Sequence, residues 1–361
     1  MFKISNNLAT ALLTVMHFSV DGLCALLIFS SLYSSDYYNT LNVFLIYNTL
    51  AFIFQIPIGF LIDKFNRPRL FLALSLLFLA LAYLFFSNFI LSAVLLGLCN
   101  SFFHISGGKQ VINNTNNDIS HLGIFVATGA TGLVLGQRFF SLTLFIIFIV
   151  LLAISAAIVF LSKNNANSAH NNLTNETILN KKDAKLTFVL LFLTVFVVFI
   201  RAFIGKINVF NFTTTNLTFL LIAISTTLGK AVGGILAKRL NINLITIISM
   251  LASTLLLTLA TQSLYAFLLG LFLFNFSMPI TLYFAGELLK KYQATAFGIL
   301  AGTLFIGYLF GMLNFSSSLK LMLIAILGVI SMLLILVVNK KITQNNYALK
   351  NSTLKRVNNN D

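Results

Sequence analysis

The run LNVFLIYNTLAFIFQIPIGFLI, residues 41–62, is followed at once by DKFNRPR, residues 63–69. The first stretch is almost entirely apolar, and it has the roughly 20 residues that a helix needs to cross the hydrocarbon core of a bilayer. The second stretch is short, polar and basic, which is typical of a turn at a membrane surface. Together they predict a spanning helix that ends at a basic loop.

The composition extends this interpretation to the whole chain. Of its 361 residues, 58% are hydrophobic and only 9% are charged. A soluble domain has about a quarter of its residues charged, so this chain has too few charges to cover a surface in water. We therefore expect apolar side chains to face lipid, in an all-α integral membrane protein.

About twelve apolar stretches have the length of a membrane helix. They are residues 10–33, 41–62, 69–87, 89–108, 122–140, 141–162, 186–206, 216–237, 242–260, 262–286, 294–314 and 319–338. A polar, Asn-rich segment separates the sixth from the seventh, and a charged segment follows the last. We expect an N-terminal six-helix bundle over 1–162, a cytoplasmic linker over 163–185, a C-terminal six-helix bundle over 186–338 and a disordered cytoplasmic tail over 339–361.

The basic residues follow the positive-inside pattern when the N-terminus is placed in the cytoplasm and the helices alternate. The cytoplasmic segments and helix ends then hold most of the 23 Lys and Arg residues: Lys3, Lys64, Arg67, Arg69, Lys109, Lys163, Lys181, Lys182, Lys185, Lys238, Arg239, Lys290, Lys291, Lys340, Lys341, Lys350, Lys355 and Arg356. This distribution accounts for the net charge of +15 without a nucleic-acid partner. It predicts a multi-pass protein of the plasma membrane with both termini in the cytoplasm.

The two halves of the chain carry related signals at a nearly constant offset. The helix ending Gly59–Lys64 corresponds to Gly233–Lys238, Gly97-Leu98 corresponds to Gly270-Leu271, and Gly123, Gly132 and Gly136 correspond to Gly298, Gly307 and Gly311. Equivalent members are six helices apart and so have the same orientation. The sequence therefore predicts a parallel repeat about an axis along the membrane normal, as in one large class of transporters.

The loop Gly59-Phe60-Leu61-Ile62-Asp63-Lys64-Phe65-Asn66-Arg67-Pro68-Arg69 resembles the signature of the major facilitator superfamily, Gly-x-Leu-x-Asp-Arg/Lys-x-Gly-Arg-Arg. Asn66 stands where that pattern has Gly, and Asn also tolerates left-handed backbone angles. The resemblance covers the whole chain. It implies two six-helix halves that rock around a central cavity and expose it to each side in turn.

The resemblance also implies a gate. In the family, the Asp of this loop faces the start of the eleventh helix, where unpaired N–H groups and the helix dipole favour an anion. Here the pair is Asp63 and a point near Thr295, and we expect Arg67 to hold Asp63 in position. The full candidate gate is Gly59, Asp63, Lys64, Arg67 and Arg69. The alternative is that Asp63 is an exposed loop charge.

Two further segments resemble the fosmidomycin-resistance branch of the superfamily. They are Met16-His17-Phe18-Ser19-Val20-Asp21 and Phe102-Phe103-His104-Ile105-Ser106-Gly107-Gly108. That branch has His-x-x-x-Asp in helix 1 and a Phe-His-Pro-x-Gly-like segment in helix 4, where Ile105 replaces the Pro. The resemblance implies an antiporter for efflux of a drug or metabolite. Uptake of a metabolite by a symporter or a uniporter is the alternative.

Polar side chains inside the predicted helices are candidates for coupling and substrate binding. His17 and Asp21 lie four residues apart and so share one face of helix 1. A charge at the centre of a membrane helix costs about 2.5–3.5 kcal/mol, and such groups mark proton or substrate pathways. We expect this pair to exchange a proton near neutral pH. The alternative is a hydrogen bond that fixes helix 1 to a neighbour. Asn100 and His104 form a second such pair, which lines a cavity or packs helices together.

Two cations complete the candidate cavity. Arg201 lies in helix 7, and Lys230 lies in helix 8. Either residue can bind an anionic substrate or pair with Asp21. The alternative is that these long side chains extend to the membrane surface, which costs little.

The sequence lacks the motifs of an ATP site and of a metal site. The sequence has no Gly-rich phosphate loop followed by Lys-Ser/Thr, so we predict no ATP drive and no cofactor. The four histidines, His17, His104, His121 and His170, are scattered, so we predict no metal-ligand cluster. An enzyme is not expected, although an intramembrane enzyme and a channel are the competing classes. The expected partners are a small-molecule substrate, protons and the lipid bilayer, with no nucleic acid, and we expect a monomer.

Overall fold

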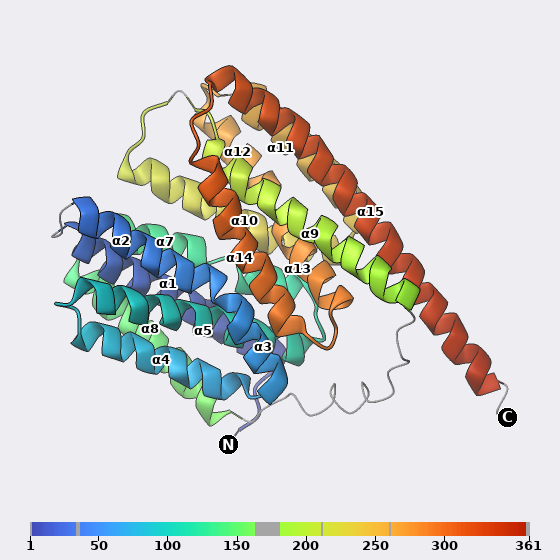
Figure 1. The fold of residues 1–361 in the computed structure, drawn as a ribbon, viewed down its shortest axis with the longest axis horizontal. Coiled ribbons are helices and arrows are strands. Elements are labelled where there is room, and N and C mark those ends of the chain that lie inside the picture. Colours follow the sequence, from blue (N-terminus) through green and yellow to red (C-terminus); the bar gives the residue numbers. More distant parts are fainter. Residues whose placement is uncertain (1, 34–36, 163–180, 211, 260, 359–361) are drawn as a thin grey trace.

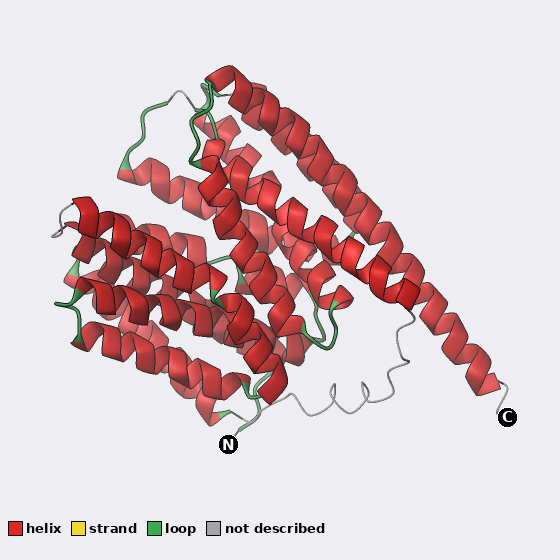
Figure 2. Ribbon diagram, in the orientation of Figure 1, coloured by secondary structure: helices red, strands yellow, loops and turns green. Residues whose placement is uncertain are grey.

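The computed structural model describes residues 2–33, 37–162, 181–210, 212–259 and 261–358, and Figure 2 shows them as helices joined by loops. Within these residues, eleven helical segments are long and apolar enough to cross a membrane, and Pro68–Leu84 is a shorter apolar helix. Together they supply the twelve helices that the sequence predicts. The chain is an all-α integral membrane protein, as the low share of charged residues requires.

The N-terminal repeat contains the first six spanning units. They are α1 (Asn6–Tyr33), then α2 (Tyr37–Asn48) with a π-helical turn η1 (Thr49–Ile53) and α3 (Gln55–Phe65), then α4 (Pro68–Leu84), α5 (Phe89–Thr115), α6 (Ile119–Phe125) with α7 (Gly129–Arg138), and α8 (Leu142–Leu161). The second and fifth units are thus interrupted helices.

The C-terminal repeat contains the other six. They are α9 (Lys181–Ile207), α10 (Asn216–Arg239), α11 (Ile242–Leu259), α12 (Leu264–Phe274) with α13 (Ser277–Leu288), α14 (Gln293–Gly311) and α15 (Ser317–Asn358). In Figure 1 the α1–α8 group and the α9–α15 group lie side by side. Helix α3 contacts α14, and α6 contacts α10, across the boundary between them.

The repeat predicted from the glycines is visible in how the two groups meet. Gly298 of α14 packs against the backbone carbonyl of Gln55 in α3, and its counterpart Gly123 of α6 packs against the carbonyl of Lys230 in α10. The eleventh unit therefore rests on the second, and the fifth rests on the eighth. A side chain at either glycine would separate the backbones, which is why small residues occur at such helix contacts.

Two of the interruptions have proline as their cause. A proline within a helix removes a backbone N–H and clashes with the carbonyl four residues earlier. Pro57 follows the break between η1 and α3, and Pro279 follows the break between α12 and α13. Each proline lies in the first turn of the helix that follows the break. The third interruption, residues 126–128 between α6 and α7, contains no proline.

The two ends of the C-terminal repeat differ from the predicted limits. Helix α9 begins at Lys181, inside the predicted linker 163–185, and residues 163–180 lie outside the described part of the chain. The prediction of a disordered tail over 339–361 is wrong for most of its length, because α15 continues without a break to Asn358. Asn, Lys and Gln do not break a helix, so the polar composition alone does not end it.

Candidate functional site

A carboxylate lies at the centre of the N-terminal repeat. Asp21 of α1 is 8% exposed. Its Oδ1 accepts hydrogen bonds from Asn100 Nδ2 at 2.8 Å and from His104 Nε2 at 2.9 Å, both from α5. Its Oδ2 lies 3.2 Å from His17 Nε2, one turn earlier on α1. The structure thus brings together four residues that the sequence analysis identified as two separate pairs.

The break in the fifth unit fixes the orientation of His17. Because α6 ends at Phe125, the carbonyl of that residue accepts no helical hydrogen bond, and His17 Nδ1 lies 2.7 Å from it. A carbonyl only accepts, so we assign a hydrogen to Nδ1. The other nitrogen, Nε2, is then the one directed at Asp21. An unwound segment inside a membrane protein is tolerated where its backbone groups find such partners.

The cluster is closed by rings on one side and by a glycine on the other. His17 packs against Phe103, Phe125 and His104, with ring centroids 5.9, 5.1 and 4.5 Å apart. At Gly129, the first residue of α7, an added Cβ would contact Asp21 Oδ2 and His17 Nε2. The glycine therefore keeps open the space beside the two facing atoms, and the rings limit the access of water.

The expectation of no metal-ligand cluster is corrected by this geometry. The ligand-capable atoms of His17, Asp21 and His104 all lie within 4.8 Å of one another. The histidines are scattered in sequence, but α1 and α5 pack side by side and bring two of them to the same carboxylate. Hydrogen bonds already use His104 Nε2 and Asp21 Oδ1, whereas His17 Nε2 and Asp21 Oδ2 face each other at 3.2 Å. The chemistry that the arrangement supports without any added group is proton binding.

The C-terminal repeat contributes two cations to the same region. Arg201 of α9 is 8% exposed, and its Nη1 donates a hydrogen bond of 3.2 Å to Thr281 Oγ1 in α13. Lys230 of α10 is half-buried, and its backbone carbonyl and Pro279 of α13 both lie against Gly123 of α6. Arg201 is therefore buried within the helix bundle rather than extended away from it.

Asp63 occupies the position that the resemblance implies. Its carboxylate accepts hydrogen bonds from the backbone N–H groups of Ala294 (3.1 Å) and Thr295 (2.8 Å), in the first turn of α14, and from the Thr295 hydroxyl (2.9 Å). Its side chain is fully buried, so it is not an exposed loop charge. At Gly59 an added Cβ would lie 2.5 Å from the Ala294 carbonyl oxygen, so this contact requires glycine.

The cation beside Asp63 is Lys109 rather than Arg67. Lys109 Nζ of α5 lies 3.2 Å from Asp63 Oδ1 and donates to Gln293 Oε1 at 3.4 Å. Arg67 is exposed at the start of α4, because Asn66 adopts a left-handed conformation with φ of 48° and turns the chain outward. The expected Arg67–Asp63 contact is therefore corrected. The replacement of the usual glycine by Asn66 is confirmed as compatible with the turn.

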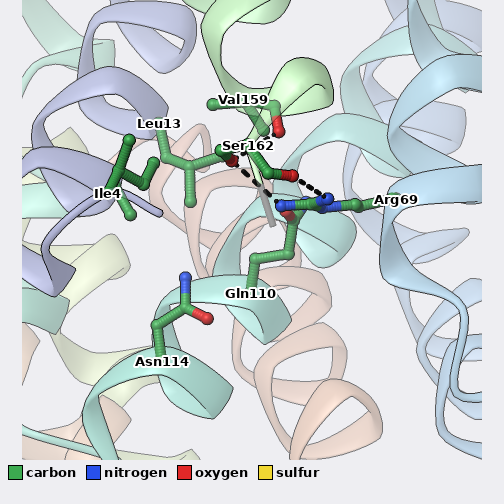
Figure 3. Close-up of a pocket in the computed structure, with 8 residues that line it drawn as sticks. Ile4, Leu13, Arg69, Gln110, Asn114, Val159 and Ser162 are labelled. Atoms are coloured by element: carbon green, nitrogen blue, oxygen red, sulfur yellow. Dashed lines mark hydrogen bonds between the residues drawn. The ribbon is translucent and has the colours of Figure 1, made fainter. Parts of the chain in front are cut away.

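The other two gate candidates make contacts within their own repeat. Lys64 is exposed, and its ammonium lies 5.8 Å from the ring of Phe65. Arg69 donates to the carbonyl of Ser162 (2.8 Å) and to its hydroxyl (3.1 Å), at the end of α8, beside a small pocket that Gln110 also lines (Figure 3). A cation at a helix C-terminus is stabilised by the helix dipole. Arg69 thus ties α4 to α8.

A second set of contacts joins the repeats next to Asp63. Asp118, which caps the N-terminus of α6, forms an ion pair with Lys238 in the last turn of α10. Asn117 donates to the carbonyl of Tyr283 at 3.1 Å and to Glu287 Oε1 at 2.9 Å, both in α13. We call the end of the bundle that holds these contacts and Asp63 the basic end. The repeats are latched to each other there.

The environment of Asp118 favours its charged form. Burial alone would raise the pKa of this carboxyl, but hydrogen bonds from Lys238, Ser120 and His121 outweigh burial and hold the pKa well below its usual range. Each of these donors binds the ionised carboxylate, which lowers a carboxyl pKa. The ion pair is therefore retained in mildly acidic conditions.

Sequence reasoning missed several of the residues in these sites. The residues concerned are Lys109, Asn117, Asp118, Phe125, Gly129 and Thr281. Asp118 before an apolar run is a helix-cap signal, and consecutive asparagines at 116 and 117, both with positive φ, are a turn signal. The role of the Phe125 carbonyl has no side-chain signature, so no motif search could have found it.

Twelve spanning helices in two parallel repeats, with buried charges between them and a latch at one end, define a membrane transporter. A search of the curated proteins finds no match. The family model of the Major Facilitator Superfamily matches residues 8–312, and the chain belongs to this superfamily. It is a family of secondary transporters, so the protein is a membrane transporter.

Solved structures of the same fold agree in architecture. The chain is similar to a variant of the fucose:proton symporter FucP of E. coli, with 12% identity over 93% of this chain and 99% of that chain, and a TM-score of 0.63. A second structure, FucP in the outward conformation, matches with a TM-score of 0.66 at 12% identity, over 91% of this chain and 98% of that chain. At this identity the likeness shows the fold alone.

Proposed function

We propose that this protein is a proton-coupled secondary transporter that moves a small solute by alternating access. The observation that supports the proposal is the pair of facing atoms at Asp21 and His17. With a hydrogen assigned to Nδ1, a neutral His17 would place a lone pair 3.2 Å from the carboxylate of Asp21. Two such acceptors repel. A single extra proton, held by the imidazole or by the carboxylate, removes the repulsion.

Asp21 carries the coupling in this proposal, and His17 shares its proton. Asn100 and His104 hold the other carboxylate oxygen in place, so a proton that enters or leaves is confined to Oδ2 and Nε2. When the repeats rock, the polar surroundings of the pair change, and its affinity for the proton changes with them. The structurally similar FucP is a fucose:proton symporter, which is compatible with a proton as the coupling ion in this fold.

The gating part of the proposal assigns the latch at the basic end to the cytoplasmic side. In this proposal both termini are cytoplasmic and the protein lies in the plasma membrane. The basic residues at that end follow the positive-inside rule, which supports the orientation. Residues 1–162 and 186–338 are proposed as the bundles that rock, and 163–185 contains the linker between them. The cytoplasmic tail is 339–361, into which α15 continues as far as Asn358. The bonds from Asp63 to α14 then close the cytoplasmic side, and their release opens it.

We propose export in exchange for protons as the direction of transport, on the strength of the His-x-x-x-Asp segment, with uptake by symport as the alternative. Sealed proteoliposomes that contain a pH-sensitive dye separate the two directions. When a solute enters the lumen down its own gradient, an antiporter makes the lumen more alkaline and a symporter makes it more acidic. Candidate solutes are fosmidomycin, cationic drugs, organic acids and sugars.

The variant Asp21→Asn tests the coupling residue, since asparagine keeps the shape and accepts hydrogen bonds but does not exchange a proton. We expect a solute-triggered pH change in the wild type and none in Asp21→Asn. Asp183→Asn, in the first turn of α9, is the matched control and should behave as the wild type. A variant Asp21→Asn that retained the full pH change would refute the assignment. A labelled solute that equilibrates without any pH change would identify a uniporter.

A further inference from the structure

The two cations of the candidate cavity, Arg201 and Lys230, have few hydrogen-bond acceptors and no paired carboxylate among the described residues. Among the residues that the structure describes, the hydrogen-bond partner of the Arg201 side chain is the neutral hydroxyl of Thr281, at 3.2 Å. A guanidinium carries five N–H donors, and that single bond uses one of them. Arg201 is nevertheless 8% exposed. Its remaining donors are thus withdrawn from bulk water and available to a ligand.

Lys230 lies where the two repeats meet. Its backbone carbonyl contacts Gly123 of α6, across the boundary between the repeats. In the described part of the chain no carboxylate forms an ion pair with its ammonium. Gly123 also lies against Pro279 of α13, and Arg201 is bonded to Thr281, two residues further along that helix. The two cations therefore lie in one region of the transporter.

The charges of that region do not balance. The carboxylate of Asp21 belongs to the cluster in the N-terminal repeat, where Asn100 and His104 bond its Oδ1 and His17 faces its Oδ2. Arg201 and Lys230 remain as two positive charges that repel each other. A buried charge without a compensating partner is strongly unfavourable, and ionisable groups inside the membrane mark substrate and ion pathways. The missing component is an anion.

We propose that Arg201 and Lys230 bind a small organic oxyanion, a carboxylate or a phosphonate, as the transported solute. This inference rests on the proposed transport function and names its substrate class. The planar fork of Arg201 matches two oxygens of either group, and Lys230 adds a point charge. A cationic drug would be repelled by the pair, and a neutral sugar would leave both charges uncompensated.

Binding to the purified full-length protein in detergent tests the inference. Thermal unfolding is measured with lactate, malate, methylphosphonate and fosmidomycin, and with fucose and tetraphenylphosphonium as neutral and cationic solutes. We expect at least one anion to raise the Tm in a dose-dependent way. Arg201→Gln and Lys230→Gln should each weaken that affinity at least about tenfold. Arg138→Gln, which removes a cation stacked on Phe219, should not. The two classes of anion separate carboxylate from phosphonate recognition.

Arg201→Lys separates a loss of affinity from misfolding. This variant keeps the positive charge but loses the planar fork of the guanidinium, and it should bind the anion with intermediate affinity. The inference is overturned if fucose or tetraphenylphosphonium stabilises the protein and the anions do not. It is also overturned if no anion stabilises the protein, or if both Gln variants keep full affinity. Binding requires neither protons nor rocking. Anion binding without any transport in proteoliposomes would therefore leave the anion site standing, and it would count against the proposed function and against the anion as the transported solute.

Discussion

Asp63 and Thr295 are joined twice: Oδ2 of the carboxylate accepts the backbone N–H of Thr295 at 2.8 Å and its hydroxyl at 2.9 Å. Asp63 lies near the end of the second spanning unit, and Thr295 lies near the start of the eleventh. The carboxylate of Asp63 therefore bridges the two repeats. A carboxylate at a helix N-terminus also gains from the helix dipole. The contact is strong and local, and one substitution removes its charge.

Asp63→Asn should shift the protein toward the state that is open at the basic end. The variant replaces charge-assisted hydrogen bonds with neutral ones, at a cost of about 1.5–3 kcal/mol, which corresponds to a shift of about tenfold or more in the balance of states. Spin labels at the exposed residues Phe65 and Tyr292, in a background where Cys24 and Cys99 are replaced by Ala, report the separation of the two repeats. We expect a larger population at long distance. Lys64→Gln is the control, and an unchanged distance distribution in Asp63→Asn would refute the latch.

Gly59→Ala should disturb the same contact by volume instead of charge. The added methyl would lie 2.5 Å from the Ala294 carbonyl oxygen and 2.8 Å from Thr295 Cα, both of which are backbone atoms. Overpacking of this kind costs about 1–3 kcal/mol. We expect a lower Tm and the same distance shift as in Asp63→Asn. Gly205→Ala, where nothing lies within 4 Å of the added Cβ, should change neither measurement.

Lys238→Gln should destabilise the protein in a pH-dependent way. The pKa of Asp118 is held below its usual range in the folded state, so its ion pair stabilises the fold above the ordinary carboxyl pKa of about 4. That contribution is lost as the pH falls from about 4 through the lower folded value. The difference in Tm between wild type and variant should be full at neutral pH and should shrink below about pH 4. Arg239→Gln, at the exposed next position, is the control. A Tm difference that did not depend on pH would contradict the ion pair.

Gly129→Ala should uncouple transport from protons while the fold is preserved. The methyl would occupy the space beside Asp21 Oδ2 and His17 Nε2, and it would separate the two atoms that share the proton. We expect the solute-triggered pH change in proteoliposomes to fall at least about tenfold, because a small displacement of two reacting groups lowers the rate of their reaction by a large factor. Chelation of metal ions with EDTA should leave the wild-type signal unchanged. A Gly129→Ala protein with normal coupling would argue for a purely structural histidine–aspartate bond.

The sequence predicts the fold well, because the length and hydropathy of each apolar stretch, and the basic residues in the loops beside it, identify a spanning helix without reference to the other helices. The motif at Gly59–Arg69 also predicts the Asp63–Thr295 contact. A single sequence does not show which residues of different helices lie close together in the folded protein. His17 with His104, and Asp63 with Lys109, are pairs created by the packing of α1 and α3 on α5. Arg67, which stands nearer to Asp63 in sequence, is turned away by the conformation of Asn66.

The short helix α6 has a consequence for how the two sites act together. Its N-terminal cap, Asp118, is bound to Lys238, and its last carbonyl, at Phe125, is bound to His17. Its 7 residues span about 10 Å, and a hydrogen-bonded helix of that length moves as a rigid body without changing its own conformation. The break at 126–128 releases it from α7. The hydrogen bond to His17 and the ion pair at the basic end are therefore made by opposite ends of one short helix, so a displacement of α6 would affect both contacts at once.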